Sequence, residues 1–344
     1  MHQAQLIRSQ VEGISRPRIL VDTNVWRYLI DLDGLETVYR AAKGADGLIL
    51  ACPAVLYEML RLEDAPLRHR LVKAICRSRW FKMMPEAFEE SAELRAEIAR
   101  LRPSWLLSNP DLPAFNRLFN DWKGPRGVWW RARTDPSRAS AILKAVEGDR
   151  IPLARTEAIE RRGEIGKITT FETVTLNKWT TTFPLKPDGW DGGPVETWRA
   201  ETAGYYIRAL LEETSLAPTE REWLEPWVDL AAIQNDVPSF ARLFWYETDA
   251  SYLPRSWLRC ALGTLQATRK TGSGTPVDNQ IGSYLVDADL LVTADRVFAS
   301  IVQRVADEEI VRVATPVLTS VDTCVSMLIA LLRQEPSAPT RPLT

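Results

Sequence analysis

The sequence predicts an α/β fold in which a parallel sheet flanked by helices is interrupted by a mostly α-helical insertion. Short aliphatic runs bounded by polar residues occur near both ends of the chain, for example at 19–21 and 290–293. Such runs are typical of strands buried in a parallel sheet. Stretches with helical periodicity separate these runs, and strands that alternate with helices indicate parallel pairing. The middle of the chain has helical periodicity but almost no strand-like run.

The first eighty residues predict the order strand, helix, strand, helix, helix. The first strand is 19–21, and the apolar residues of the next helix, including Trp26, share one face. The second strand is 47–51, and Pro53 fits the first position of the helix that follows it.

The last seventy residues repeat this pattern, so we expect both ends of the chain to build one sheet. The prediction is a helix at 277–286, a strand at 290–293, a helix at 296–305, a strand at 310–314 and a final helix. The helices predicted between them are 85–101, 137–146, 194–214, 219–232 and 255–269. The predicted domains are therefore 1–84 with 260–335, a helical insertion at 85–259, and a disordered tail at 336–344.

Composition excludes several kinds of site. The 344 residues carry 43 basic and 45 acidic side chains, so the net charge of −2 provides no global basic field for nucleic acid. With only two histidines and four scattered cysteines, His-based triads and His/Cys zinc sites are not expected. No signal peptide or membrane span is predicted, and the cysteines are typical of a reduced, soluble, cytoplasmic protein.

Four acidic residues stand where predicted strands and helices meet. Asp22 follows the first strand, Glu58 lies in the helix after the second strand, Asp278 opens a later helix, and Asp295 follows the strand at 290–293. Taken singly, Asp22 and Asp278 are as readily explained as helix N-caps, and Glu58 as a solvated helix residue. Together they converge on the carboxyl edge of one sheet, where carboxylates repel one another unless a cation lies between them. Oxygen ligands without His or Cys indicate Mg²⁺ or Mn²⁺.

This pattern resembles the PIN-domain nucleases. The similarity rests on the strand ending in Val21-Asp22-Thr23-Asn24, on Glu58, on Asp278 and on the run from Leu291 to Phe298, and it covers residues 1–80 and 260–335. The resemblance implies a PIN-like parallel sheet with catalytic, metal-binding acids at Asp22, Glu58, Asp278 and Asp295. It also implies that Asn24 and Thr293 orient these acids and contact the substrate region. The expected chemistry is phosphodiester hydrolysis by a metal-activated water.

The large insertion departs from the family pattern, since about 220 positions separate Glu58 from Asp278. It contains the segment 124–133, in which arginines alternate with tryptophans as in single-stranded nucleic-acid grooves. We expect Arg126, Arg131 and Arg133 to contact substrate there, and Arg296 to contact it beside Asp295. The alternatives are that the tryptophans are core residues, that the insertion arginines are solvated, and that Arg296 pairs with an acid.

The favoured function is a metal-dependent endonuclease, most simply a ribonuclease, which acts as a toxin or defence effector held by an inhibitory protein. RNA is the expected substrate and DNA the nearest variant, and a homo-oligomer is compatible with the sequence. A different class of protein is a catalytically silent PIN-like scaffold that binds RNA or a protein partner. A phosphatase of the haloacid-dehalogenase type also has Asp after its first strand, but it requires an acid where this chain has Asn24.

Overall fold

The computed structural model describes residues 17–45, 47–148, 156, 159–160, 162–163, 169–176, 187–190, 192–193, 195–211, 220–269 and 275–333, with 275–278 in backbone only. The predicted tail at 336–344 and the first sixteen residues lie outside these ranges. No helix in the described part of the chain is long and apolar enough to cross a lipid bilayer.

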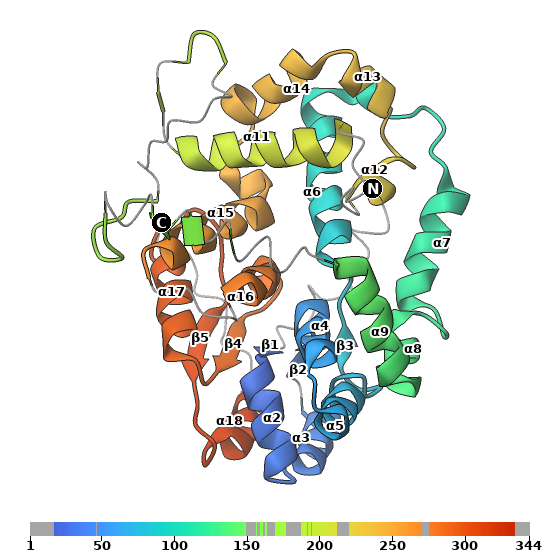
Figure 1. The fold of residues 1–344 in the computed structure, drawn as a ribbon, viewed down its shortest axis with the longest axis vertical. Coiled ribbons are helices and arrows are strands. Elements are labelled where there is room, and N and C mark those ends of the chain that lie inside the picture. Colours follow the sequence, from blue (N-terminus) through green and yellow to red (C-terminus); the bar gives the residue numbers. More distant parts are fainter. Residues whose placement is uncertain are drawn as a thin grey trace, which may run out of the picture.

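A five-stranded, all-parallel sheet forms the centre of the α/β fold, in the order β3-β2-β1-β4-β5 (Figure 1). Its strands are β1 (Arg18–Val21), β2 (Leu48–Ala51), β3 (Phe81–Lys82), β4 (Leu290–Thr293) and β5 (Thr315–Leu318). Ile19 of β1 pairs with Ile49 on one side and with Leu290 on the other, so the two ends of the chain do build one sheet. The predicted parallel sheet flanked by helices is confirmed.

Helices cover this sheet because each directs an apolar face toward it. On α2, for example, Val25, Trp26 and Leu29 are fully buried, and the Trp26 Nε1 donates a 3.0 Å hydrogen bond to the carbonyl of Val21. Buried aliphatic residues on both faces are what a parallel sheet requires. The helices built from the two ends of the chain are α2 (Thr23–Asp31), α3 (Leu35–Lys43), α4 (Pro53–Arg61), α5 (Ala65–Ile75), α16 (Thr275–Gly282), η4 (Ser283–Val286), α17 (Arg296–Ala306) and α18 (Cys324–Leu332).

The segment between β3 and α16 is helical wherever it has regular structure, within the described residues. Figure 1 places α11, α13 and α14 at one end of the molecule and α3 and α18 at the other. Its helices are α6 (Glu86–Leu101), η1 (Pro103–Trp105), α7 (Leu112–Lys123), α8 (Val128–Thr134), α9 (Pro136–Glu147), α11 (Glu196–Leu211), α12 (Glu220–Leu224), α13 (Leu230–Gln234), α14 (Val237–Arg242), η2 (Leu243–Glu247), η3 (Ala250–Tyr252) and α15 (Pro254–Ala267).

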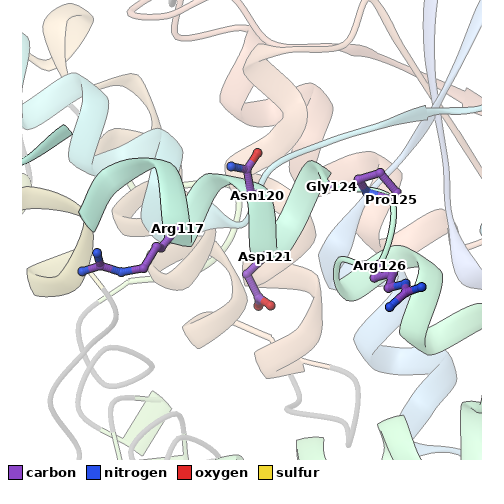
Figure 2. Close-up of a pocket in the computed structure, with 6 residues that line it drawn as sticks. All are labelled: Arg117, Asn120, Asp121, Gly124, Pro125 and Arg126. Atoms are coloured by element: carbon purple, nitrogen blue, oxygen red, sulfur yellow. The ribbon is translucent and has the colours of Figure 1, made fainter. Parts of the chain in front are cut away.

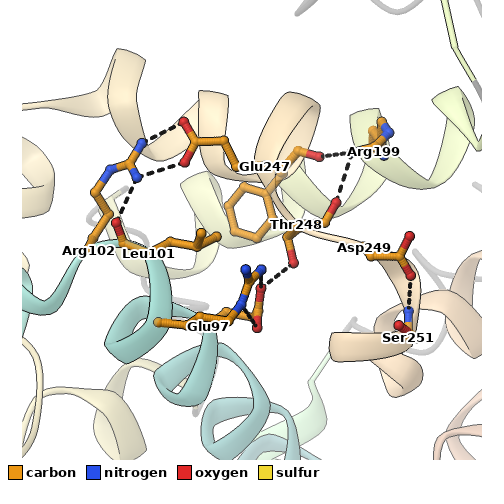
Figure 3. Close-up of polar contacts among 10 residues, drawn as sticks. Glu97, Leu101, Arg102, Arg199, Glu247, Thr248, Asp249 and Ser251 are labelled. Atoms are coloured by element: carbon orange, nitrogen blue, oxygen red, sulfur yellow. Dashed lines mark hydrogen bonds and ion pairs between the residues drawn. The ribbon is translucent and has the colours of Figure 1, made fainter.

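Polar contacts fix the carboxyl end of α6 to the segment around η2 (Figure 3). The Thr248 hydroxyl donates to Glu97 at 2.6 Å, and Arg102 donates to Glu247 at 2.8 Å. Arg199 donates to the carbonyls of Phe244 and Thr248 at 2.8 and 3.1 Å. The apolar core is also continuous, since one cluster of buried side chains includes residues of the sheet and of the helical segment. The helical segment is therefore tied together by polar contacts and shares its apolar core with the sheet.

The last strand was predicted at the wrong place. The structure puts β5 at Thr315–Leu318, whereas 310–314 is the connection that precedes it. The connection contributes only Ala314 to the fully buried core, and its other apolar side chains are half-buried. Pro316 lies within β5, which is acceptable because β5 is an edge strand.

The helix predicted at 219–232 is in fact two short helices, α12 and α13. Pro226 interrupts them because proline lacks the backbone N–H and its ring clashes with the preceding turn of a helix. The chain between them instead pairs with the loop after η1, through hydrogen bonds from Leu107 to the Trp227 carbonyl and from Asp111 to the Pro226 carbonyl. The side chain of Asp229 then caps the start of α13.

Candidate functional site

Neighbouring strands bring Asp22 and Asp295 to the same edge of the sheet. Val21, the last residue of β1, pairs with Val292 of β4, and the Asp22 N–H donates to the Val292 carbonyl at 3.0 Å. The chain runs from β1 toward β2 and β3 on one side and returns to β4 and β5 on the other. The two acids thus lie at the topological switch point, where open α/β sheets bind ligands.

Asp22 is a buried carboxylate, 7% exposed, that is held by hydrogen bonds on both oxygens. Its Oδ1 accepts from the Thr23 N–H at 2.7 Å, so it also caps α2. Its Oδ2 accepts from the Asn24 amide at 2.9 Å and from the Thr293 hydroxyl at 2.6 Å. Burial raises the pKa of Asp22 above its ordinary value, these hydrogen bonds lower it, and the nearby Asp295 carboxylate raises it again.

Thr293 and Asn24 connect the two strand ends through their side chains. The Thr293 hydroxyl donates to Asp22 and accepts from the Asp295 N–H at 3.0 Å. The Asn24 carbonyl oxygen accepts from the Ala294 N–H at 3.1 Å while its amide donates to Asp22. Because each side chain is used at both ends, the Asp22 carboxylate has one defined orientation.

Glu58 joins this group from α4. The Thr23 hydroxyl, next to Asp22 in sequence, donates a short hydrogen bond to the Glu58 Oε2. Burial raises the pKa of Glu58, the Thr23 hydroxyl lowers it, and the Asp22 charge raises it further. Thr23 is the residue that our prediction from sequence missed, although its hydroxyl lies between two of the predicted acids.

Asp295 forms the exposed side of the group and caps α17. Its Oδ1 accepts from the Val297 and Phe298 N–H groups at 2.7 and 3.0 Å. The next residue, Arg296, is exposed and forms no ion pair with any residue that the structure describes. The alternative, in which Arg296 pairs with a neighbouring acid, is therefore not seen there.

The structure describes the position of Asp278 only in its backbone. Asp278 is the fourth residue of α16, which begins at Thr275, so it does not open the helix as predicted. Helix α16 packs against α4, the helix that carries Glu58. The side chain of this fourth predicted acid lies outside the described part of the chain.

In the described part of the chain, the acids of the site form no direct ion pair, and Arg61 is the basic residue whose charge acts on Glu58. Within the described residues, Asp22, Glu58 and Asp295 form no ion pair with lysine, arginine or histidine. Carboxylate oxygens without His or Cys suit Mg²⁺ or Mn²⁺ better than zinc. Among the side chains that the structure describes, no three His, Cys, Asp or Glu residues are arranged so as to hold a metal ion. The buried Asp22 and the half-buried Glu58, which form no ion pair with a described residue, are the part of the site that fits a cation.

The predicted arginines of the insertion have different surroundings. Arg131 forms a two-pronged ion pair with Asp121, at 2.6 and 2.8 Å. Arg126 and Arg133 are exposed. Trp129 is a core residue, 3% exposed, whereas Trp130 is 47% exposed. The alternative of a core tryptophan therefore applies to Trp129, and of this pair only Trp130 is accessible for stacking on a base.

An open depression of about 620 Å³ lies on the exposed side of α7 and the loop that follows (Figure 2). Arg117 and Arg126 line it from opposite ends, with Asn120 and Asp121 between them. Helix α7 was not predicted, although Phe115, Phe119 and Trp122 follow helical spacing. Because α7 was not predicted, the ion pair between Arg131 and Asp121, which lies on α7, was not predicted either.

Comparisons with protein-family models, with curated proteins and with solved structures found no match to this chain.

Proposed function

We propose that the chain is a metal-dependent endonuclease of the PIN type that cuts RNA. The observation that supports this most is the contact of Asp22 and Glu58, through Thr23, at the switch point of a parallel sheet. Two acids with raised pKa values and no ion pair in the described structure form a site that gains from binding a cation. Perturbed acids of this kind are typical of functional sites.

Each side chain of the site has a separate proposed role. Thr293 and Asn24 hold Asp22 in place, while Asp295 is exposed to solvent and caps α17 through its Oδ1. A divalent cation at the acids would lower the pKa of a water molecule and neutralise the charge that develops on the phosphate. Arg296, beside Asp295 and free of described partners, is placed to contact a phosphate of the strand. Asp278 is the proposed fourth acid.

The exposed cations and Trp130 of the helical segment are proposed to bind the strand outside the site. Arg126 and Arg133 would contact phosphates, and Trp130 would stack on a base. Arg131 fits this role less well because Asp121 already occupies its guanidinium. All four cysteines are buried and none is in a disulfide, which suits a reducing cytoplasm.

A second candidate is a PIN-like scaffold that binds RNA or a protein without cutting. The helix caps favour this candidate: Asp22 caps α2 and Asp295 caps α17, so both acids have a structural role that does not require catalysis. We also propose that the chain can bind an inhibitory protein or form a homo-oligomer.

The test is cleavage of total RNA, single-stranded DNA and double-stranded DNA with Mn²⁺, Mg²⁺ or EDTA. We expect metal-dependent cutting of RNA by the native chain, lost in Asp22→Asn and kept in Asp307→Asn. Asp307 ends α17 on the exposed surface and is a matched change of charge outside the site. Binding of RNA without cutting under all conditions would favour the scaffold.

A further inference from the structure

Among the described residues, Arg61 is the basic side chain whose charge acts on Glu58, one of the acids of the site. It lies on α4 one helical turn beyond Glu58, and its charge lowers the pKa of Glu58 against the raising effect of burial. Arginine is the residue that best matches the two-pronged geometry of a phosphate. Arg61 is thus a second position, besides Arg296, where a phosphate next to the acids would meet a cation.

The guanidinium of Arg61 is occupied by a carboxylate from the helical segment. Its Nε lies 3.1 and 3.2 Å from the two carboxylate oxygens of Glu147, and its Nη2 donates to Glu147 and, at 3.3 Å, to Gln280. The contact joins three helices: Arg61 lies on α4, Glu147 is the last residue of α9, and Gln280 lies on α16. Glu147 is 86 positions and Gln280 is 219 positions from Arg61 in sequence. Carboxylate and phosphate use the same guanidinium edge, so Glu147 stands where a phosphate would bind.

The contact is also incomplete. The side chains of Arg61 and Glu147 are only 17% and 16% exposed, yet the buried Nη1 of Arg61 has no hydrogen-bond partner among the described residues. A buried donor without a partner is costly, and a fully formed structural ion pair would use it. A phosphate has more acceptor oxygens than a carboxylate and would satisfy this donor as well.

We propose that Arg61 binds a phosphate of the RNA strand beside the acidic site, and that Glu147 covers Arg61 until the strand displaces it. The inference rests on the proposed function for its ligand, but it assigns a new substrate contact and an internal competitor. Glu147 is the last residue of α9, and Gly148 follows it with a φ of +47°. Releasing Glu147 therefore frees the end of a helix without breaking the helix.

The test is the affinity for a fluorescently labelled single-stranded RNA in EDTA, measured by anisotropy for the native chain, Glu147→Gln, Arg61→Met and the double variant. We expect Glu147→Gln to bind about tenfold more tightly and Arg61→Met about tenfold more weakly. The slope of log affinity against log salt should fall by about 0.7 in Arg61→Met, as for one lost phosphate contact.

The double variant decides between displacement and simple repulsion. If Glu147 acts by covering Arg61, the gain from Glu147→Gln disappears when Arg61 is Met. A gain of the same size in both backgrounds would overturn the inference, because Glu147 would then only repel RNA. Glu225→Gln, which removes the acid of the exposed pair with Arg221, is the control and should leave affinity unchanged.

Two further readouts keep the outcome clear. The double variant leaves no buried charge unpaired, so it remains testable if Arg61→Met alone unfolds; RNA binding as tight as that of Glu147→Gln would overturn the proposal. Cleavage by the native chain, lost in Asp22→Asn, together with an unchanged affinity in Glu147→Gln would refute this inference and leave the proposed function standing. A native chain that neither binds nor cuts RNA would refute both.

Discussion

Thr293 offers the sharpest test of how the site is held together. It is fully buried, donates at 2.6 Å to the Asp22 carboxylate and accepts at 3.0 Å from the Asp295 N–H. Thr293→Val keeps the shape of the side chain and removes both hydrogen bonds. One of these is to a group that carries charge, so the expected loss in the free energy of unfolding is about 3 kcal/mol.

Thr293→Ser is the matched control, because it keeps the hydroxyl and removes one methyl group. Its expected cost is about 1 kcal/mol for the lost apolar contact. Both variants would be compared with the native chain by urea denaturation in EDTA. A Thr293→Val protein as stable as Thr293→Ser, or more stable, would refute the account of Thr293 as the link between the two acids.

The same variant has a predicted pH dependence. The Thr293 hydroxyl lowers the pKa of Asp22, so its removal raises that pKa beyond the increase that burial already causes. The destabilisation should be largest where Asp22 is charged in the native chain and should shrink as the pH falls through the pKa of Asp22. If the stability difference does not change with pH, the Thr293 hydroxyl does not favour the charged form of Asp22, which would contradict this prediction.

Three other changes follow from the structure. Asp295→Asn should keep the stability of the native chain, since Asn caps helices as well as Asp, but should abolish metal-dependent cutting, which Asp307→Asn retains; equal activity in both would contradict the site. Glu93 on α6 forms an ion pair with the buried Arg255 on α15. Burial raises the pKa of Glu93 from 4.5 to about 7 against the effect of Arg255, so Glu93 contributes stability that is present below pH 4.5 and lost as the pH rises through 7. Glu93→Gln should therefore flatten the pH dependence of unfolding by up to about 3 kcal/mol; an unchanged profile would contradict this. Trp130→Ala should weaken RNA binding about tenfold and change stability by less than about 0.5 kcal/mol; an unchanged affinity would remove Trp130 from the binding surface.

The strand ends could be predicted from sequence because buried parallel strands leave a strong local pattern. The aliphatic runs of β1, β2 and β4 place Asp22 and Asp295 at strand ends, and parallel strands share their carboxyl edge. Strand β3 has only two residues, Phe81 and Lys82, which is too short to form a pattern. The connection before β5 is apolar enough to resemble a strand, so that strand was predicted five residues too early.

The surroundings of the arginines could not be predicted, because they depend on contacts between distant segments. Arg61 meets Glu147, which lies 86 positions away, and Arg131 meets Asp121 on a helix that was not predicted. Trp129 and Trp130 are adjacent and chemically identical, and only the packing of α8 decides which of them is buried. Local sequence therefore predicted where Asp22 and Asp295 lie better than it predicted the contacts of the arginines.

The most direct test of the central claim is the binding of Mn²⁺ by the purified chain, followed by electron paramagnetic resonance. The account predicts saturable binding of Mn²⁺ to the native chain and to Asp307→Asn, with binding lost in Asp22→Asn. Native protein that leaves all the Mn²⁺ free in solution, or an Asp22→Asn variant that binds it equally well, would contradict the claim that Asp22 and the acids beside it at the β1–β4 switch point hold a catalytic cation.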